Sequence, residues 1–338
     1  MIQGSRGHMS LIAMVLILFS TAVAAGVLLP AGMAIRLQLR REQQDATVIQ
    51  LRDATAQVLN LLQNQLNEPA DTPQSPIWPQ LASLQRQLQN NKDSIDIDLQ
   101  DVSSLLNPNW VSSFLLERTD LDSLLQPGKS IQGLQQYREE AGFSHDIVQH
   151  YQEWFQEDAL QELLSPYSFA NINVSDEHSL RQLIAQRAGE DRLIGEYFHS
   201  RIQQQRQLQE LLQPDELERF FGSHYDLLTP VVNAEPMMNL HFAPPRIIRS
   251  ILAYTAWELP SPATVAEDVL SRREAGLQAE QLPALLGIEA DHPLLQYFGV
   301  RTHFWQIQAR QEDRVLTTVV AMLNDQAVVI RSLKQDKE

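Results

Sequence analysis

An uncharged run near the start of the chain limits its folding more than any other feature. Met9 to Ile35 is 27 residues long and contains no charged side chain. At about 1.5 Å of rise per residue, a helix of this length spans a hydrocarbon core of about 30 Å. We therefore predict a single transmembrane helix. Pro30 lacks an amide proton and predicts a kink, which membrane helices tolerate.

The same stretch also has the features of a secretory signal peptide. Arg6 forms a basic first region, Met9 to Phe19 an apolar one, and Ala22-Val23-Ala24 has the A-x-A form of a cleavage site. Cleavage there would leave Gly26 to Ile35 as an exposed apolar N-terminus, so we favour a helix that is retained. One arginine precedes the run and three follow it closely, so the positive-inside rule does not favour a C-terminal domain outside the cytoplasm.

The helical pattern continues into the polar part of the chain. No Gly or Pro occurs between Ile35 and Pro69. Apolar residues recur on one face of the expected helix, which predicts a packing stripe at Leu51, Val58, Leu62 and Leu66. Such a stripe suits either a coiled-coil stalk or packing on a domain of the same chain.

The remaining sequence changes its period twice. Asp93 to Leu99 alternates apolar and acidic residues, which predicts a half-buried strand. The patterns are then helical from about 107 to 297. Three strands are predicted after that, at His303–Ala309, Val315–Leu323 and Ala327–Leu333, with short polar connections typical of an antiparallel meander. We expect the lone early strand to pair with them, which gives an α+β fold with an inserted all-α domain.

The helical region contains an internal repeat. The segment NINVSDEHSLRQLIA begins at Asn171, and NLHFAPPRIIRSILA begins 68 residues later at Asn239. Three positions are identical and several others are apolar in both. Each copy has a short extended piece that leads into a helix. Ser175 or Asp176 can cap the first helix, and the Pro244-Pro245 pair can open the second. Chance similarity of two amphipathic helices is the alternative.

Composition and motifs exclude several classes of function. The net charge is −16 and no basic block follows the N-terminal region, which argues against nucleic acid as a partner. The chain has no cysteine and none of the common nucleophile, phosphate-loop, dinucleotide or zinc-protease motifs. We predict no catalytic residue and expect a protein that is not an enzyme.

Taken in order, these segments resemble the K-type minor pseudopilin of type II secretion, general secretion pathway protein K. Members have helix-hairpin-helix-like repeats that open with N-x-N-T-A, and Asn171-Ile172-Asn173 and Asn239-Leu240-His241 stand in those places. His241 departs from the second Asn, and Thr is absent from both copies. The family's "EL…G…L.P" segment, second-repeat helix and terminal strands have counterparts at Asp215–Val232, Ala266–Gly276 and Val300–Leu323.

The resemblance implies a complete domain plan. An N-terminal transmembrane helix continues into a long pilin-like helix that packs on a small antiparallel sheet, and a large all-α domain is inserted between the strands. The expected parts are a leader at 1–7, a transmembrane helix at 8–35, a pilin-like helix and first strand at 36–106, a helical domain at 107–297 with repeats at 171–210 and 239–276, and terminal strands at 298–338.

The resemblance also implies how the protein is processed and used. Prepilin peptidase would cut after Gly7 and leave His8 as the first residue. Ile12 then stands where most pilins carry Glu, which K-type subunits also lack, in keeping with a place at the pseudopilus tip. The protein would initiate or cap pseudopilus assembly for export across the outer membrane. It would sit in the inner membrane as a single-pass protein with a periplasmic C-terminal domain.

The implied partners are the I- and J-type minor pseudopilins, the major pseudopilin, prepilin peptidase and the inner-membrane assembly platform. A minor pilin of a related type IV pilus remains an alternative, as does a periplasmic enzyme on a signal anchor. Family members can bind calcium through oxygen ligands in the helical domain. Here Glu153, Glu157 and Asp158 are the candidates, although no loop shows the six to eight oxygens that calcium takes. No other cofactor is expected.

Overall fold

The computed structural model describes residues 46–89, 94–118, 120–141, 151–189, 192–208, 210–323 and 326–336. The chain divides into two compact units, Met1–Ala54 and Thr55–Glu338. Gly7, His8 and the predicted transmembrane helix at 8–35 lie outside the described residues. Within the described ranges, no helix has both the length and the apolar character needed to cross a membrane. The fold is mixed α+β with an antiparallel sheet, as predicted.

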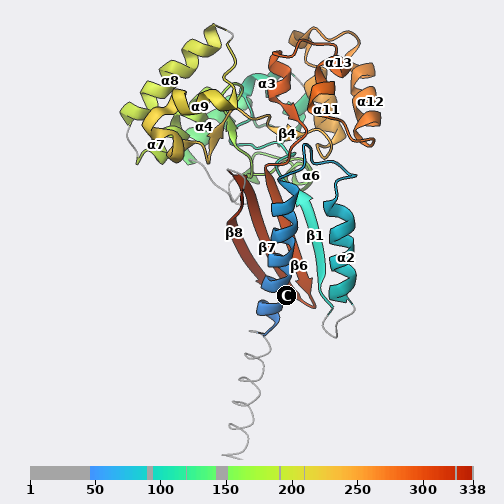
Figure 1. The fold of residues 1–338 in the computed structure, drawn as a ribbon. Coiled ribbons are helices and arrows are strands. Elements are labelled where there is room, and N and C mark those ends of the chain that lie inside the picture. The colour runs from blue at the N-terminus through green and yellow to red at the C-terminus, as the bar shows by residue number, and fades with distance from the viewer. Residues whose placement is uncertain are drawn as a thin grey trace, which may run out of the picture. The chain divides into compact units, whose positions relative to one another are not determined.

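A four-stranded antiparallel sheet lies in the second unit (Figure 1). Its strands, in the order β1-β6-β7-β8, are β1 (Asp96–Asp101), β6 (Phe304–Gln311), β7 (Arg314–Leu323) and β8 (Gln326–Asp336). The early strand β1 pairs with β6, with Leu99 opposite Ile307. The predicted meander and the pairing of the lone strand are therefore confirmed. Because β1 and β6 are neighbours, the helical region between them is an insertion.

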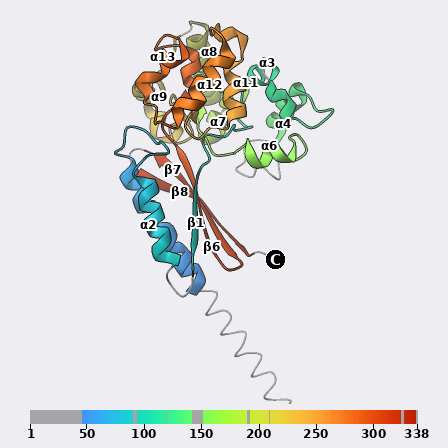
Figure 2. The same cartoon turned by 90° about the vertical axis from the view of Figure 1, so that its right-hand side faces the viewer.

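Both faces of the sheet are covered near the start of β6. In the helix at 46–65, the side chains of Val58 and Leu62 are completely buried. The helix α2 (Ile77–Gln89) runs beside β1 (Figure 2), where the Gln85 side chain accepts a hydrogen bond from Ile97 N at 2.7 Å. Trp305 packs edge-on against Trp78 of α2, and Phe304 packs against Phe169 on the other side. Trp78 lies in the first turn of α2.

The insertion opens with a group of short helices and continues into two similar halves. The opening elements are α3 (Ser113–Arg118), η1 (Asp120–Leu124), α4 (Ile131–Ala141) and α6 (Glu157–Glu162), where η denotes a 3-10 helix. The first half contains β2 (Ala170–Asn171), α7 (Glu177–Arg187), α8 (Arg192–Gln207), η2 (Pro214–Glu216), α9 (Leu217–Phe221), η3 (Gly222–His224), α10 (Tyr225–Leu228) and β3 (Val232–Asn233). The second half contains β4 (Met238–Asn239), α11 (Pro245–Leu252), η4 (Thr255–Trp257), α12 (Pro262–Arg273), η5 (Ala279–Gln281), α13 (Leu282–Leu286), η6 (Pro293–Gln296) and β5 (Phe298–Gly299).

Each half closes on itself through a pair of two-residue parallel strands, β2 with β3 and β4 with β5. The similarity extends beyond the predicted ends at 210 and 276. Gln213 and Gln278 each open a capping box, and α9 and α13 each end at a glycine with positive φ, Gly222 at 57° and Gly287 at 70°. A positive φ at the end of a helix favours glycine, which has no Cβ to clash. The repeated unit is therefore a closed module that is longer than the two helices alone.

Candidate functional site

Asn171 and Asn239 open the two modules in the same way. Both side chains are completely buried. Each side-chain oxygen accepts a hydrogen bond from the backbone N–H two residues later, at 2.7 Å from Asn173 and 3.0 Å from His241. Each backbone carbonyl accepts from the residue four positions on, Ser175 and Ala243, at 2.9 Å. This Asx turn reverses a short strand into the approach to a helix, and Asn suits it because its side chain imitates a backbone carbonyl.

The amide nitrogens of the two asparagines connect successive parts of the fold. Asn171 Nδ2 donates to the Glu235 carbonyl at 2.7 Å and to Gln296 Oε1 at 3.1 Å, so it joins the first module to the second. Asn239 Nδ2 donates to the Asp71 carbonyl at 2.8 Å and to Thr302 Oγ1 at 2.9 Å, so it joins the second module to the segments that flank the sheet. The same repeated residue therefore makes two consecutive links.

The second motif position also keeps its role despite the change from Asn to His. The Asn173 side chain accepts from Leu212 N at 3.0 Å and donates to Leu212 O at 2.9 Å, just after α8. His241 Nε2 lies 3.0 Å from Leu277 O, just after α12. Both side chains fix the segment that follows the second helix of their module.

One arginine closes each module from the end of its second helix. Arg206 donates to the Ser175 carbonyl at 2.8 Å, and Arg273 donates to the equivalent Ala243 carbonyl at 2.7 Å. Burial lowers the pKa of both arginines. Their hydrogen bonds go to backbone carbonyls that end the Asx turn, which indicates a structural use.

A buried carboxylate stands at the junction between the sheet and the insertion. Asp101, the last residue of β1, is 6% exposed. It accepts hydrogen bonds from both the backbone and the hydroxyl of Ser103 and of Ser104, and from Thr302 Oγ1 at 2.6 Å. Burial raises the pKa of Asp101 to about 6, although the hydrogen bonds favour its charged form. Ser104 Oγ in turn accepts from Asn239 N at 3.2 Å.

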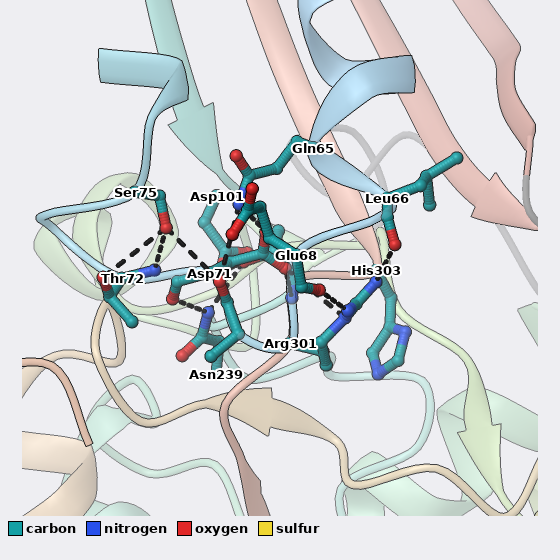
Figure 3. A network of polar contacts seen from close by, with 12 residues as sticks. Gln65, Leu66, Glu68, Asp71, Thr72, Ser75, Asp101, Asn239, Arg301 and His303 are labelled. Atoms are coloured by element: carbon teal, nitrogen blue, oxygen red, sulfur yellow. Dashed lines mark hydrogen bonds and ion pairs between the residues drawn. The ribbon is translucent and has the colours of Figure 1, made fainter. Parts of the chain in front are cut away.

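Asp71 joins the end of the helix at 46–65 to the same junction (Figure 3). It accepts from the Gln65 amide at 2.9 Å and from Thr302 N at 2.7 Å, and burial raises its pKa. Arg301 lies 3.9 Å from the Asp71 carboxylate and donates to the carbonyls of Leu66 and Glu68. A cation that binds the carbonyls at a helix C-terminus stabilises that end. Helix, sheet and insertion therefore meet in one buried polar network.

The predicted packing stripe is placed as follows. Leu51, Val58 and Leu62 are buried. Leu66 follows the last helical residue and is half-buried, and the buried position at the end of the helix belongs to Gln65. The Gln65 amide donates a hydrogen bond to the buried Asp71 carboxylate at 2.9 Å.

The candidate calcium ligands lie on the surface. Glu153, Glu157 and Asp158 are exposed, and the last two form the first turn of α6, where negative charge stabilises a helix. Among the described residues, no group of three or more His, Asp or Glu side chains could hold a metal ion. Calcium binding stays a prediction.

Sequence reasoning found the two asparagines but missed Asp71, Asp101, Arg301 and Thr302. A local signal existed for Asp101, because serines stand two and three residues after it. An Asp in this position often accepts hydrogen bonds from the backbone N–H groups of the following turn. The pairing of Asp101 with Thr302 had no local signal, since 201 residues separate them.

No protein-family model matches the chain, and no curated protein matches its sequence. Among solved structures, the chain is similar to one in the crystal structure of the GspK-GspI-GspJ complex from the enterotoxigenic Escherichia coli type 2 secretion system. The alignment covers 89% of this chain and 100% of that one, with 13% identity and a TM-score of 0.33.

Proposed function

We propose that this protein is a non-enzymatic minor pseudopilin of the K type, which initiates or caps the pseudopilus of a type II secretion system. One observation carries the proposal. A helix leads into a four-stranded antiparallel sheet, and a large helical region is inserted between the neighbouring strands β1 and β6. This is the plan that the sequence resemblance implies for the family.

The buried network at the junction supports a role in assembly rather than catalysis. Asp101, Asp71 and Asn239 are engaged with hydroxyls, amides and backbone groups of the same chain. Such a network holds the helical insertion in one orientation on the sheet, because each buried polar group loses its partner if the two parts separate. A subunit that caps a filament needs this fixed orientation to present one surface to its neighbours.

The finer parts of the proposal concern the N-terminal region and the partners. Residues 8–35 anchor the protein in the inner membrane after prepilin peptidase removes residues 1–7, and the described region lies in the periplasm. The I- and J-type minor pseudopilins are the proposed contacts. Calcium binding through Glu153, Glu157 and Asp158 would be a separate property of the insertion.

The test is reconstitution in cells of the source organism that lack this protein. The full chain is returned with an affinity tag, the secretion of a known exported protein is measured, and complexes are isolated after detergent extraction. We expect restored secretion and a complex that contains the I- and J-type subunits. Unchanged secretion in the deletion strain together with no such complex rejects the proposal. A complex with type IV minor pilins would favour the alternative filament.

A further inference from the structure

The outer edge of β8 has exposed aliphatic side chains and, among the described residues, no neighbouring strand. β8 is the last strand of the sheet, and among the described residues only β7 pairs with it. Its aliphatic residues are well exposed, namely Val328 at 38%, Val329 at 45%, Ile330 at 39% and Leu333 at 40%. Edge strands are usually short or protected, because an open edge accepts another strand. β8 is 11 residues long and contains no proline.

The hydrogen-bond ladder fixes which backbone groups point outward. Met322 N donates to His303 O on the β6 side, so Ala327, its partner in β8, points its own N–H away from β7. That N–H donates to Gln63 Oε1 at 2.9 Å. Alternation, shifted by the bulge opposite Val319 and Val320, turns the N–H groups of Val329 and Ser332 outward as well. The described part of the chain therefore covers this edge only at its beginning.

An apolar groove of about 650 Å³ adjoins this edge. Phe304, Leu323 and Ile330 line it from the sheet, and Leu183 and Leu227 line it from the insertion. Leu227 is 46% exposed. Since Ile330 belongs to the edge strand itself, a strand added to β8 would place its groove-side residues next to this apolar lining.

The charges around the groove are unlike those of the chain as a whole. The net charge of the protein is −16, yet no Asp or Glu is found among the described residues that line the groove. One charged residue, Arg187, is found among them. Arg187 is exposed at the groove. β8 adds Arg331, whose guanidinium donates to the hydroxyl of the groove-lining Tyr167 at 3.0 Å. The local surface therefore complements a segment that carries a carboxylate.

We propose that the β8 edge docks an extended segment of another protein, which adds to the sheet as a strand with apolar residues beside Ile330 and a carboxylate near Arg187. Backbone hydrogen bonds supply affinity in this mode of recognition, and pockets for alternate side chains supply specificity. The inference goes beyond the proposed function, because it assigns a binding surface, a binding mode and the chemistry of the bound segment.

The test places a photo-reactive benzoylphenylalanine at Leu333 of the full-length protein in its native cells, and the cross-linked peptides are identified by mass spectrometry. Leu193, 80% exposed on α8, is the control position. We expect adducts from Leu333, and not from Leu193, on one segment with apolar residues at alternate positions and an acid among them. Absence of adducts, or adducts on a helical segment, contradicts the proposal.

Two pairs of variants separate the backbone from the charge. Val329→Pro removes an outward N–H and is expected to lower the adduct yield about tenfold, whereas Val329→Thr keeps it. Equal yields would reject strand addition. Should the proline variant unfold, Arg187→Glu against Arg187→Lys on the exposed groove rim gives the second test. The glutamate is expected to reduce the yield several-fold and the lysine to preserve it, and equal loss or no loss in both rejects the acidic segment.

The outcome also distinguishes this inference from the proposed function. Adducts on a protein unrelated to secretion filaments would support the edge as a docking site and count against the pseudopilin assignment. A complex with I- and J-type subunits that yields no adduct at Leu333 would do the opposite.

Discussion

Asp101 and Asn239 are joined twice, once through Thr302 and once through Ser104. Thr302 Oγ1 lies 2.6 Å from the Asp101 carboxylate and 2.9 Å from Asn239 Nδ2. Ser104 Oγ bonds to the same carboxylate and accepts from Asn239 N at 3.2 Å. The end of β1 is thereby fixed to the first turn of the second module, and Asn171 carries the connection on to the first.

Asp101→Ala removes the acceptor that the hydroxyls of Ser103, Ser104 and Thr302 share. The hydroxyls of Ser104 and Thr302 then lie buried without their acceptor, so we expect the free energy of unfolding to fall by about 3 kcal/mol. Asp98→Ala on the same strand is the control, because Asp98 is exposed, and its effect should stay within about 0.5 kcal/mol. Urea unfolding followed by circular dichroism measures both. Similar losses in the two variants would show that Asp101 has no special role.

The pH dependence of stability should separate Asp101 from His303. Burial raises the pKa of Asp101 from 3.8 to about 6, so its contribution to stability is full below pH 3.8 and is lost as the pH rises through 6. Burial, and then Arg301, lowers the pKa of His303 from 6.5 to about 4, so its contribution is full above pH 6.5 and is lost as the pH falls through 4. The two contributions oppose each other.

Removal of either group should therefore leave the pH dependence of the other visible. As the pH falls from 7 to 4.5, we expect the free energy of unfolding to increase for His303→Gln relative to the wild type, and to decrease for Asp101→Asn. The pH-dependent part of the Asp101 contribution to the free energy of unfolding is about 3 kcal/mol at most. That of His303 is smaller, because this side chain is partly exposed. Urea midpoints at the two pH values provide the measurement. Parallel pH profiles for the two variants would contradict the assignment.

Asn239→Ala and Asn171→Ala should loosen different parts of the protein. Each removes an Asx turn and two buried hydrogen bonds, so each should cost about 2–3 kcal/mol. In Asn239→Ala, backbone hydrogen exchange should become faster around Asp71 and Thr302, which accept the lost hydrogen bonds. In Asn171→Ala it should become faster around Glu235 and Gln296 for the same reason. Identical exchange maps would argue against two separate links.

His241→Asn restores the residue that the first module has at this position. Asn173 bonds to the backbone of Leu212, and His241 bonds to Leu277 at the corresponding place. We expect His241→Asn to cost at least about 1 kcal/mol less than His241→Ala, since the shorter amide retains a partner for the segment after α12. Thermal unfolding compares the two, and an equal loss of stability would mean that the ring acts through packing alone.

The sheet was predictable because its strands follow a period of two with short polar connections, and the early strand had no other partner in the chain. The two modules were predictable in their first halves, where Asn171 and Asn239 begin similar segments. Their ends were not, because the short helices at Leu217 and Leu282 share mainly a capping pattern. The change from Asn to His241 weakened the repeat in the sequence. The structure keeps the contact, since an imidazole nitrogen of His241 reaches the Leu277 carbonyl, which corresponds to the Leu212 carbonyl of the first module.

The junction could not be predicted from local pattern. Asp71 lies in a Pro-rich loop, a composition typical of exposed segments. Its side chain is nevertheless only 5% exposed, because Gln65 and Thr302 donate hydrogen bonds to the carboxylate. Buried carboxylates resemble surface carboxylates in sequence, and only distant partners distinguish them. Arg301 and Thr302 follow β5 and contact residues more than 200 positions away.

The N-terminus of the membrane-extracted protein tests the central claim most directly, by intact mass and N-terminal peptide sequencing. A pseudopilin processed by prepilin peptidase is predicted to begin at His8 and to retain the uncharged run up to Ile35. A chain that begins near Gly26 would be a secreted protein without the anchor, and one that begins at Met1 would be an unprocessed membrane protein. Either result would contradict the assignment to a pseudopilus.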